Sequence, residues 1–178
     1  DKKDFENISI LIPDKEFRIY YSNDLIGTQI GGALKNIYAI AAGIAEGLNL
    51  GENAKSALIS RSFAEMTRYA KKFKADKNTL FGLSGLGDLI LTCSSKNSRN
   101  TQFGIKLASS KYDNFLDLLK SQEVTEGYYT VKAVYNISQK KNIDMPIMES
   151  VYNILYKQHD LKEELSNLLS RPITEEKI

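Results

Sequence analysis

The sequence of 178 residues is poor in the residue types that mark several common sites and scaffolds. It has a single cysteine, Cys93, which excludes an internal disulfide. No charged and then apolar signal segment precedes Ile8, and together these two absences favour a reducing cytoplasm. The only histidine, His159, stands in a polar stretch, so neither a histidine triad nor a metal site has support. We therefore expect a cytoplasmic protein that uses no metal.

An excess of charge of one sign is also missing. Lysine and arginine number 24 against 22 aspartates and glutamates, which gives a formal net charge of +2. This balance does not indicate a nucleic-acid-binding domain. The pairs Tyr128-Tyr129 and Lys140-Lys141 are most simply explained as core and solvated surface, because they do not make a base-stacking platform. We expect no nucleic acid partner.

A long apolar run is missing as well. From Leu25 to Ala45 the only formally charged side chain is Lys35, and apolar residues fall on every side of a helical projection, which is typical of a helix buried all round. The longest apolar run within it, 37–45, is far below the roughly 20 residues that a membrane span requires. We therefore predict a core helix here and no membrane span.

Only three prolines interrupt the chain, which leaves long stretches free for helices. Upstream, apolar residues alternate with polar ones over 8–12 and again over 17–21, which predicts two strands. Two isolated strands are marginal in water, so we expect them to belong to a sheet completed elsewhere.

Helical spacing predicts further helices at about 53–73, 114–121, 127–140, 146–157 and 161–168. The sequence thus predicts a mainly α fold, with strands within 1–23, a helical domain over 24–170 and an exposed tail over 171–178.

Lys35 is the first candidate for chemistry. An ammonium in an otherwise apolar helix costs several kcal/mol to desolvate unless it is paired with an anion. Its neighbour Asn36 points roughly 100° away around the helix and could serve an adjacent part of the same site. Alternatively, Lys35 could simply extend its ammonium to the surface past Gly31 and Gly32.

Two further segments carry candidate residues. Asp88 follows Gly85-Leu86-Gly87 and opens an apolar run, so it could be the partner that Lys35 needs, or only the cap of the next helix. Ser98-Arg99-Asn100 precedes a helix-like segment and combines groups that suit a phosphate, although a solvated loop is the simpler explanation. Neither a phosphate-binding Gly-Lys-Ser/Thr nor a GxGxxG fingerprint is present, so the chain shows no complete nucleotide site.

Taken together, the segments 31–43, 82–93, 98–100 and 124–127 closely resemble the bacterial NAD(P)-dependent glycerol-3-phosphate dehydrogenases. They match only the C-terminal part of that family. The resemblance implies a helical substrate domain of the 6-phosphogluconate dehydrogenase C-terminal-like type, preceded by two strands left from a truncated Rossmann domain. It also implies hydride transfer between NAD or NADP and C2 of dihydroxyacetone phosphate, which yields sn-glycerol 3-phosphate for phospholipid synthesis. Without the coenzyme domain, this fragment is expected to be inactive alone.

The resemblance also implies roles for individual residues. Lys35 would act as general acid and base, and Asp88 would hold the lysine and the substrate hydroxyls in register. Substrate contacts are implied for Lys35, Asn36, Asp88, Thr92, Ser98, Arg99 and Asn100, and coenzyme contacts for Arg99, Val124 and Glu126. A homodimer is expected. Two alternatives stay open: a helical dimerisation module in which residues 25–45 pack against another subunit, and a substrate domain of a related hydroxyacid dehydrogenase.

Overall fold

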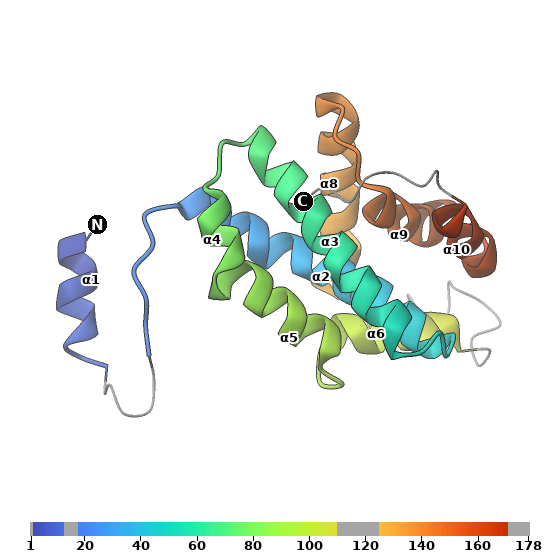
Figure 1. Ribbon diagram of the computed structural model, residues 1–178, viewed down its shortest axis with the longest axis horizontal. Helices are drawn as coiled ribbons and strands as arrows, with labels where there is room; N and C mark the ends of the chain where they lie inside the picture. Colours follow the sequence, from blue (N-terminus) through green and yellow to red (C-terminus); the bar gives the residue numbers. More distant parts are fainter. Residues whose placement is uncertain (1, 13–17, 110–124, 171–178) are drawn as a thin grey trace.

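A computed structural model describes residues 2–12, 18–109 and 125–170 of the chain (Figure 1). Every regular element within these ranges is helical, which confirms the prediction of a mainly α fold for the described residues. The elements are α1 (Lys2–Ser9), α2 (Leu25–Gly47), α3 (Glu52–Lys72), α4 (Lys77–Phe81), the π-helical turn η1 (Leu83–Gly87), α5 (Asp88–Ser94), α6 (Arg99–Ala108), α8 (Glu126–Lys141), α9 (Pro146–Lys157) and α10 (Leu161–Leu169).

Helix α2 is the centre of the fold. Helices α3, α5, α6, α8 and α9 all pack against it, and Figure 1 shows it running through the middle of the helical body. Every residue over 36–45 is buried, as predicted for a core helix. Within the described residues, no helix is long and apolar enough to cross a membrane. Because other helices of the same chain cover residues 36–45, these residues offer no free surface for packing against another subunit.

Helices α2 and α6 approach each other closely at two glycines. A Cβ atom on Gly43 would collide with the carbonyl oxygen of Thr101, and one on Gly104 would collide with that of Ile40. The two backbones are therefore in direct contact, which a larger residue at either position would prevent. This contact fixes where α6 begins, and hence where the segment 98–100 lies.

A buried carboxylate ties α3 to the start of α9. Glu65 is 1% exposed and accepts hydrogen bonds from the backbone N–H groups of Ile147 (2.6 Å) and Met148 (3.2 Å). Helix α9 begins after Met145, whose side chain cannot cap it, so Glu65 supplies the missing acceptor from another helix. Burial raises the pKa of Glu65 to about 7, and the two backbone hydrogen bonds oppose this rise.

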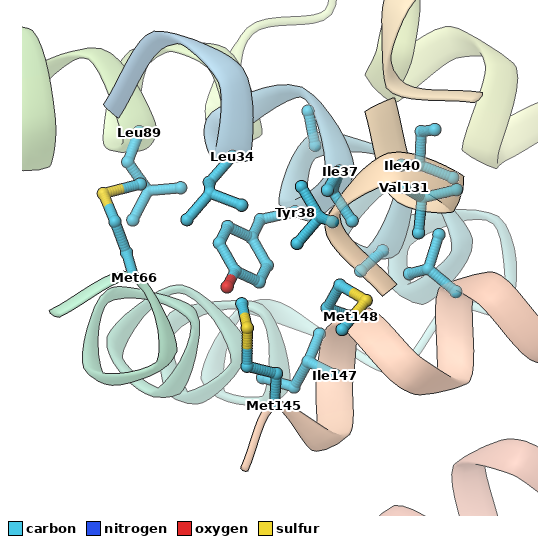
Figure 2. Packing of buried hydrophobic residues seen from close by; sticks show 14 of the residues in the cluster. Leu34, Ile37, Tyr38, Ile40, Met66, Leu89, Val131, Met145, Ile147 and Met148 are labelled. Carbon is cyan, nitrogen blue, oxygen red and sulfur yellow. The ribbon is translucent and has the colours of Figure 1, made fainter. Parts of the chain in front are cut away.

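The same carboxylate reaches α2. Tyr38 is fully buried and donates its hydroxyl hydrogen to Oε2 of Glu65 at 3.3 Å. Figure 2 shows its ring pointing from α2 into a cluster that includes Met66, Met145 and Met148. Burial raises the pKa of Tyr38 well above its ordinary value, with the charge of Glu65 adding to the effect. Glu65 thus joins α2, α3 and α9 at one point.

Cys93, near the end of α5, is fully buried. Burial raises the pKa of its thiol to about 12, so the thiol stays protonated at neutral pH. Cys93 is therefore a buried thiol of the core.

The predicted helices that fall within the described residues agree closely with the observed ones, and the two predicted strands are wrong. Residues 2–9 form α1, and residues 18–24 have neither helix nor strand. A strand needs a neighbour for its backbone groups, and the described residues offer none, so local helical hydrogen bonds prevail. Burial does not favour a strand either, because Ile8 and Ile10 are 54% and 82% exposed. The predicted connection at 13–16, Phe17, the predicted helix at 114–121 and the tail at 171–178 lie outside the described residues.

Candidate functional site

Lys35 and Asp88 form an ion pair between α2 and α5. The Nζ atom of Lys35 lies 2.5 Å from Oδ2 of Asp88, and the two side chains are 24% and 30% exposed. The predicted partnership is therefore present, and Lys35 does not point freely into solvent. Asp88 is the first residue of α5, whose capping position is Gly87. Because its carboxylate contacts Lys35 and Thr92, the alternative of a simple helix cap is not supported.

Glycines place Asp88 beside α2. The turn η1 lies so close to α2 that a Cβ atom on Gly31 would collide with the carbonyl oxygen of Ser84. Within the turn, a Cβ atom on Gly85 would collide with the backbone of Leu80. These glycines therefore allow the backbones to approach closely. It brings the start of α5 within reach of Lys35, one helical turn beyond Gly31.

Thr92 orients Asp88 from within α5. Its Oγ1 atom lies 2.6 Å from the main-chain oxygen and 3.3 Å from Oδ1 of Asp88. The buried Thr101 in turn donates to the main-chain oxygen of Thr92 at 2.9 Å. The end of α5 is thus bonded to the start of α6, which connects the Lys35 end of the site to the segment 98–100. Sequence reasoning assigned no role to Thr101, because its partner belongs to another helix.

Ser98 and Arg99 stand at the start of α6. The Oγ atom of Ser98 caps the helix by accepting a hydrogen bond from the N–H of Thr101 at 3.3 Å. Arg99 projects outward, 80% exposed, and its Nη2 atom lies 3.4 Å from Oε1 of Glu126, which is 68% exposed. A pair this exposed is weak, so both side chains are available to a ligand.

Asn36, Asn100 and the start of α8 form a second group of contacts, next to Lys35. Asn100 donates to Oδ1 of Asn36 at 3.0 Å and accepts from the backbone N–H of Gly127 at 3.0 Å. Asn36 donates to Oε2 of Glu126 at 3.3 Å. The structure therefore brings Asn36, Asn100 and Glu126 together. Val124 lies outside the described residues.

The assembled site combines a paired lysine with hydrogen-bond donors for an anion. Lys35 holds a transferable proton next to Asp88, while the amide of Asn36 and the guanidinium of Arg99 both face the carboxylate of Glu126. Such a set can bind an oxygen-rich anion at one end and exchange a proton with it at the other.

A hollow of about 280 Å³ lies elsewhere, between α9 and α10. Its lining includes Asn153, Glu164 and His159, whose Nδ1 atom is 2.7 Å from Oε1 of Glu164. No residue predicted for the site lines this hollow, so the hollow is separate from the candidate site.

Comparisons with known proteins identify the relatives of this chain. Residues 24–166 match the family described as NAD-dependent glycerol-3-phosphate dehydrogenase C-terminus. The chain is 46% identical over 158 residues to a glycerol-3-phosphate dehydrogenase [NAD(P)+] of Colwellia psychrerythraea, covering 89% of this chain and 47% of that protein. It is 44% identical over 177 residues to the one from Solidesulfovibrio magneticus, covering 99% and 53%. The chain thus spans about half the length of the curated relatives that it matches.

A comparison with solved structures finds a relative of the same kind. The crystal structure of glycerol-3-phosphate dehydrogenase from Coxiella burnetii superposes with a TM-score of 0.88 at 37% sequence identity. The match covers 96% of this chain and 52% of that one.

Proposed function

Because this chain belongs to the C-terminal family of NAD-dependent glycerol-3-phosphate dehydrogenases, we propose that it forms the substrate-binding part of such an enzyme. The reaction would interconvert dihydroxyacetone phosphate and sn-glycerol 3-phosphate. The chain spans about half of its relatives, so the complete activity is proposed for a longer protein. A homodimer is proposed for that protein as well.

The observation that carries this proposal is the Lys35–Asp88 ion pair beside Asn36 and Arg99. In the reduction, the C2 carbonyl becomes an alcohol, and its oxygen needs a proton as negative charge develops. The ammonium of Lys35 donates that proton, and in the reverse direction the neutral amine removes it. Asp88 holds the Lys35 side chain in place. Because the Lys35 side chain is 24% exposed, solvent can return a proton to its amine afterwards.

Arg99 would hold the phosphate end. It is the first residue of α6, where backbone N–H groups and the helix dipole also favour an anion. A guanidinium suits this task because it can make two parallel hydrogen bonds to phosphate oxygens.

A bound nicotinamide coenzyme, NAD or NADP, would supply or accept the hydride. Arg99 and Glu126 fit such a contact, because both side chains project from helix starts into solvent.

The test of Lys35 uses this chain joined to the coenzyme-binding half of a relative, such as the one from Solidesulfovibrio magneticus. Oxidation of NADH by dihydroxyacetone phosphate is compared for the parent and for Lys35→Met. Loss of general acid catalysis should lower kcat by about 10² to 10⁴. Lys140→Met, at the exposed end of α8, is the matched control and should leave kcat unchanged.

Unchanged turnover in Lys35→Met would contradict the role of this lysine. Reduction of NAD⁺ by sn-glycerol 3-phosphate and by 6-phosphogluconate decides the alternative of a related hydroxyacid dehydrogenase, because sn-glycerol 3-phosphate should be the better substrate by far.

A further inference from the structure

The side-chain amide of Asn36 has a donor end and an acceptor end of almost the same shape. Which end faces the ligand decides what the ligand must offer, and hydrogen-bond partners determine the answer. Asn36 is 8% exposed and Asn100 is 7% exposed, so few waters can take over their bonds. The contacts around these two residues therefore set the polarity of the site.

The inner contacts begin at a group that can only donate. The backbone N–H of Gly127 lies 3.0 Å from the Asn100 side chain, which must therefore present its Oδ1 atom to Gly127. Asn100 then presents Nδ2 to Asn36, at 3.0 Å from Oδ1. Asn36 consequently turns its own Nδ2 atom away from Asn100.

The outer contacts give the same orientation independently. The Nδ2 atom of Asn36 faces the carbonyl oxygen of Gly32 at 3.4 Å and Oε2 of Glu126 at 3.3 Å. Both partners are acceptors, so an inverted Asn36 would place three oxygen atoms against one another. The outward bonds are long, which leaves the donor free to bind a better acceptor.

Glycine is required where this chain of contacts begins. A Cβ atom on Gly127 would lie 2.7 Å from Oδ1 of Asn100 and 2.7 Å from the main-chain oxygen of Asn36. Only a glycine lets the start of α8 come this close to α2 and α6.

We propose that Asn100 is a positioning residue: with the N–H of Gly127 it fixes Asn36 as a hydrogen-bond donor toward an acceptor oxygen of the substrate. The Glu126 carboxylate, which faces both Asn36 and Arg99, stands where an oxygen-rich anion would receive the same two donors. This inference rests on the proposed function for the identity of that anion, a phosphate ester with hydroxyl or carbonyl oxygens.

The test begins with the wild-type chain labelled with ¹⁵N, in which NMR resolves the side-chain amide protons. The proposal expects nuclear Overhauser contacts from the Asn36 NH₂ protons to the γ protons of Glu126. Contacts from those protons to the β protons of Asn100 in their place would overturn it. This measurement needs no ligand and no altered residue.

The second arm is Asn100→Asp, which offers only acceptors and should make Asn36 turn its NH₂ group inward. The contacts to Glu126 should then disappear, and sn-glycerol 3-phosphate should bind roughly 10- to 100-fold more weakly, as expected when a buried polar group loses its partner. Asn97→Asp adds the same charge at an exposed position three residues earlier and should leave affinity unchanged.

An Asn100→Asp chain that keeps both the wild-type contacts and the wild-type affinity would overturn the proposal. A wild-type chain that shows the expected contacts but does not bind sn-glycerol 3-phosphate, so that its NMR signals do not shift on titration, would instead count against the proposed function. The two failures are therefore distinguishable.

Discussion

Lys35 and Glu65 are two charged residues that the fold treats differently. Lys35 is paired but keeps about a quarter of its side chain in solvent, so its ion pair with Asp88 stabilises the fold by about 1 kcal/mol or less. Its main effect is to hold the ammonium in one place. Glu65 is 1% exposed, and its contacts are with backbone N–H groups and a tyrosine rather than with a bound cation. Its ionisation therefore opposes folding.

The raised pKa of Glu65 predicts a dependence of stability on pH. Burial raises the pKa from 4.5 to about 7 in the folded chain, so between these values the folded state binds more protons than the unfolded state. The free energy of unfolding should fall as pH rises from 4.5 to 7, by up to about 3 kcal/mol from this group. Glu65→Gln should lack that part of the slope in urea denaturation measured across this range.

Glu52→Gln, at the exposed start of the same helix, is the control and should keep the wild-type slope. An identical slope in Glu65→Gln and in the wild type would contradict this account of Glu65.

At the scale of helices, sequence periodicity predicted most elements because most of them bury one face or all faces. The range 146–157 was predicted with its observed bounds, since Pro146 marks its first turn. The strand predicted over 8–12 failed because α1 ends at Ser9, residues 10–12 form a turn, and the described residues offer no neighbouring strand for pairing. Helix α4 and the turn η1 are only 5 residues each, too short for a periodic pattern.

The site was predictable where a residue is unusual within its own segment. Lys35 is the lone charge in an apolar helix, and Asp88 follows closely spaced glycines. Glu65, Thr101 and Gly127 were missed because their importance lies in partners on other helices, as with the 82 residues that separate Glu65 from Ile147. No local pattern reports such a contact.

Two glycines on α2 should respond to the same substitution in opposite ways. Gly43→Ala would force a Cβ atom into the carbonyl oxygen of Thr101 and should destabilise the chain by about 1–3 kcal/mol. Gly32→Ala meets no atom within 4 Å and should stabilise the helix by about 0.5–1 kcal/mol. Chemical denaturation of both variants measures the difference. Shifts of the same sign would contradict the close packing of α2 against α6.

On the scale of the whole molecule, the chain divides into a helical body and a separate N-terminal segment. Figure 1 shows α1 and residues 18–23 standing apart from the body. Within this segment, Phe5 contacts Tyr21 with ring centroids 5.5 Å apart, while Ile10 and Leu11 are about four-fifths exposed. The family match also begins at residue 24. The body therefore holds its own core without this segment.

Deletion of residues 1–23 should accordingly change Tm by no more than about 2 °C, measured by circular dichroism. Asp24 must be kept, because it caps α2 through the N–H of Gly27 at 2.8 Å and also accepts from the N–H of Asp76 at 2.8 Å. Asp24→Ala is the contrasting variant and should cost about 1 kcal/mol. A large fall in Tm on deletion would show that the segment belongs to the folded body.

Chemical labelling of the buried Cys93 can report how often helix α5 separates from the core. Alkylating reagents attack the thiolate, and a thiol with a pKa of about 12 inside the core is protected from them until α5 separates from its neighbours. As the sole thiol of the chain, Cys93 would be modified at the frequency with which that separation occurs. Helix α5 also carries Asp88 and Thr92, so the labelling rate measures how often the Lys35–Asp88 ion pair itself comes apart.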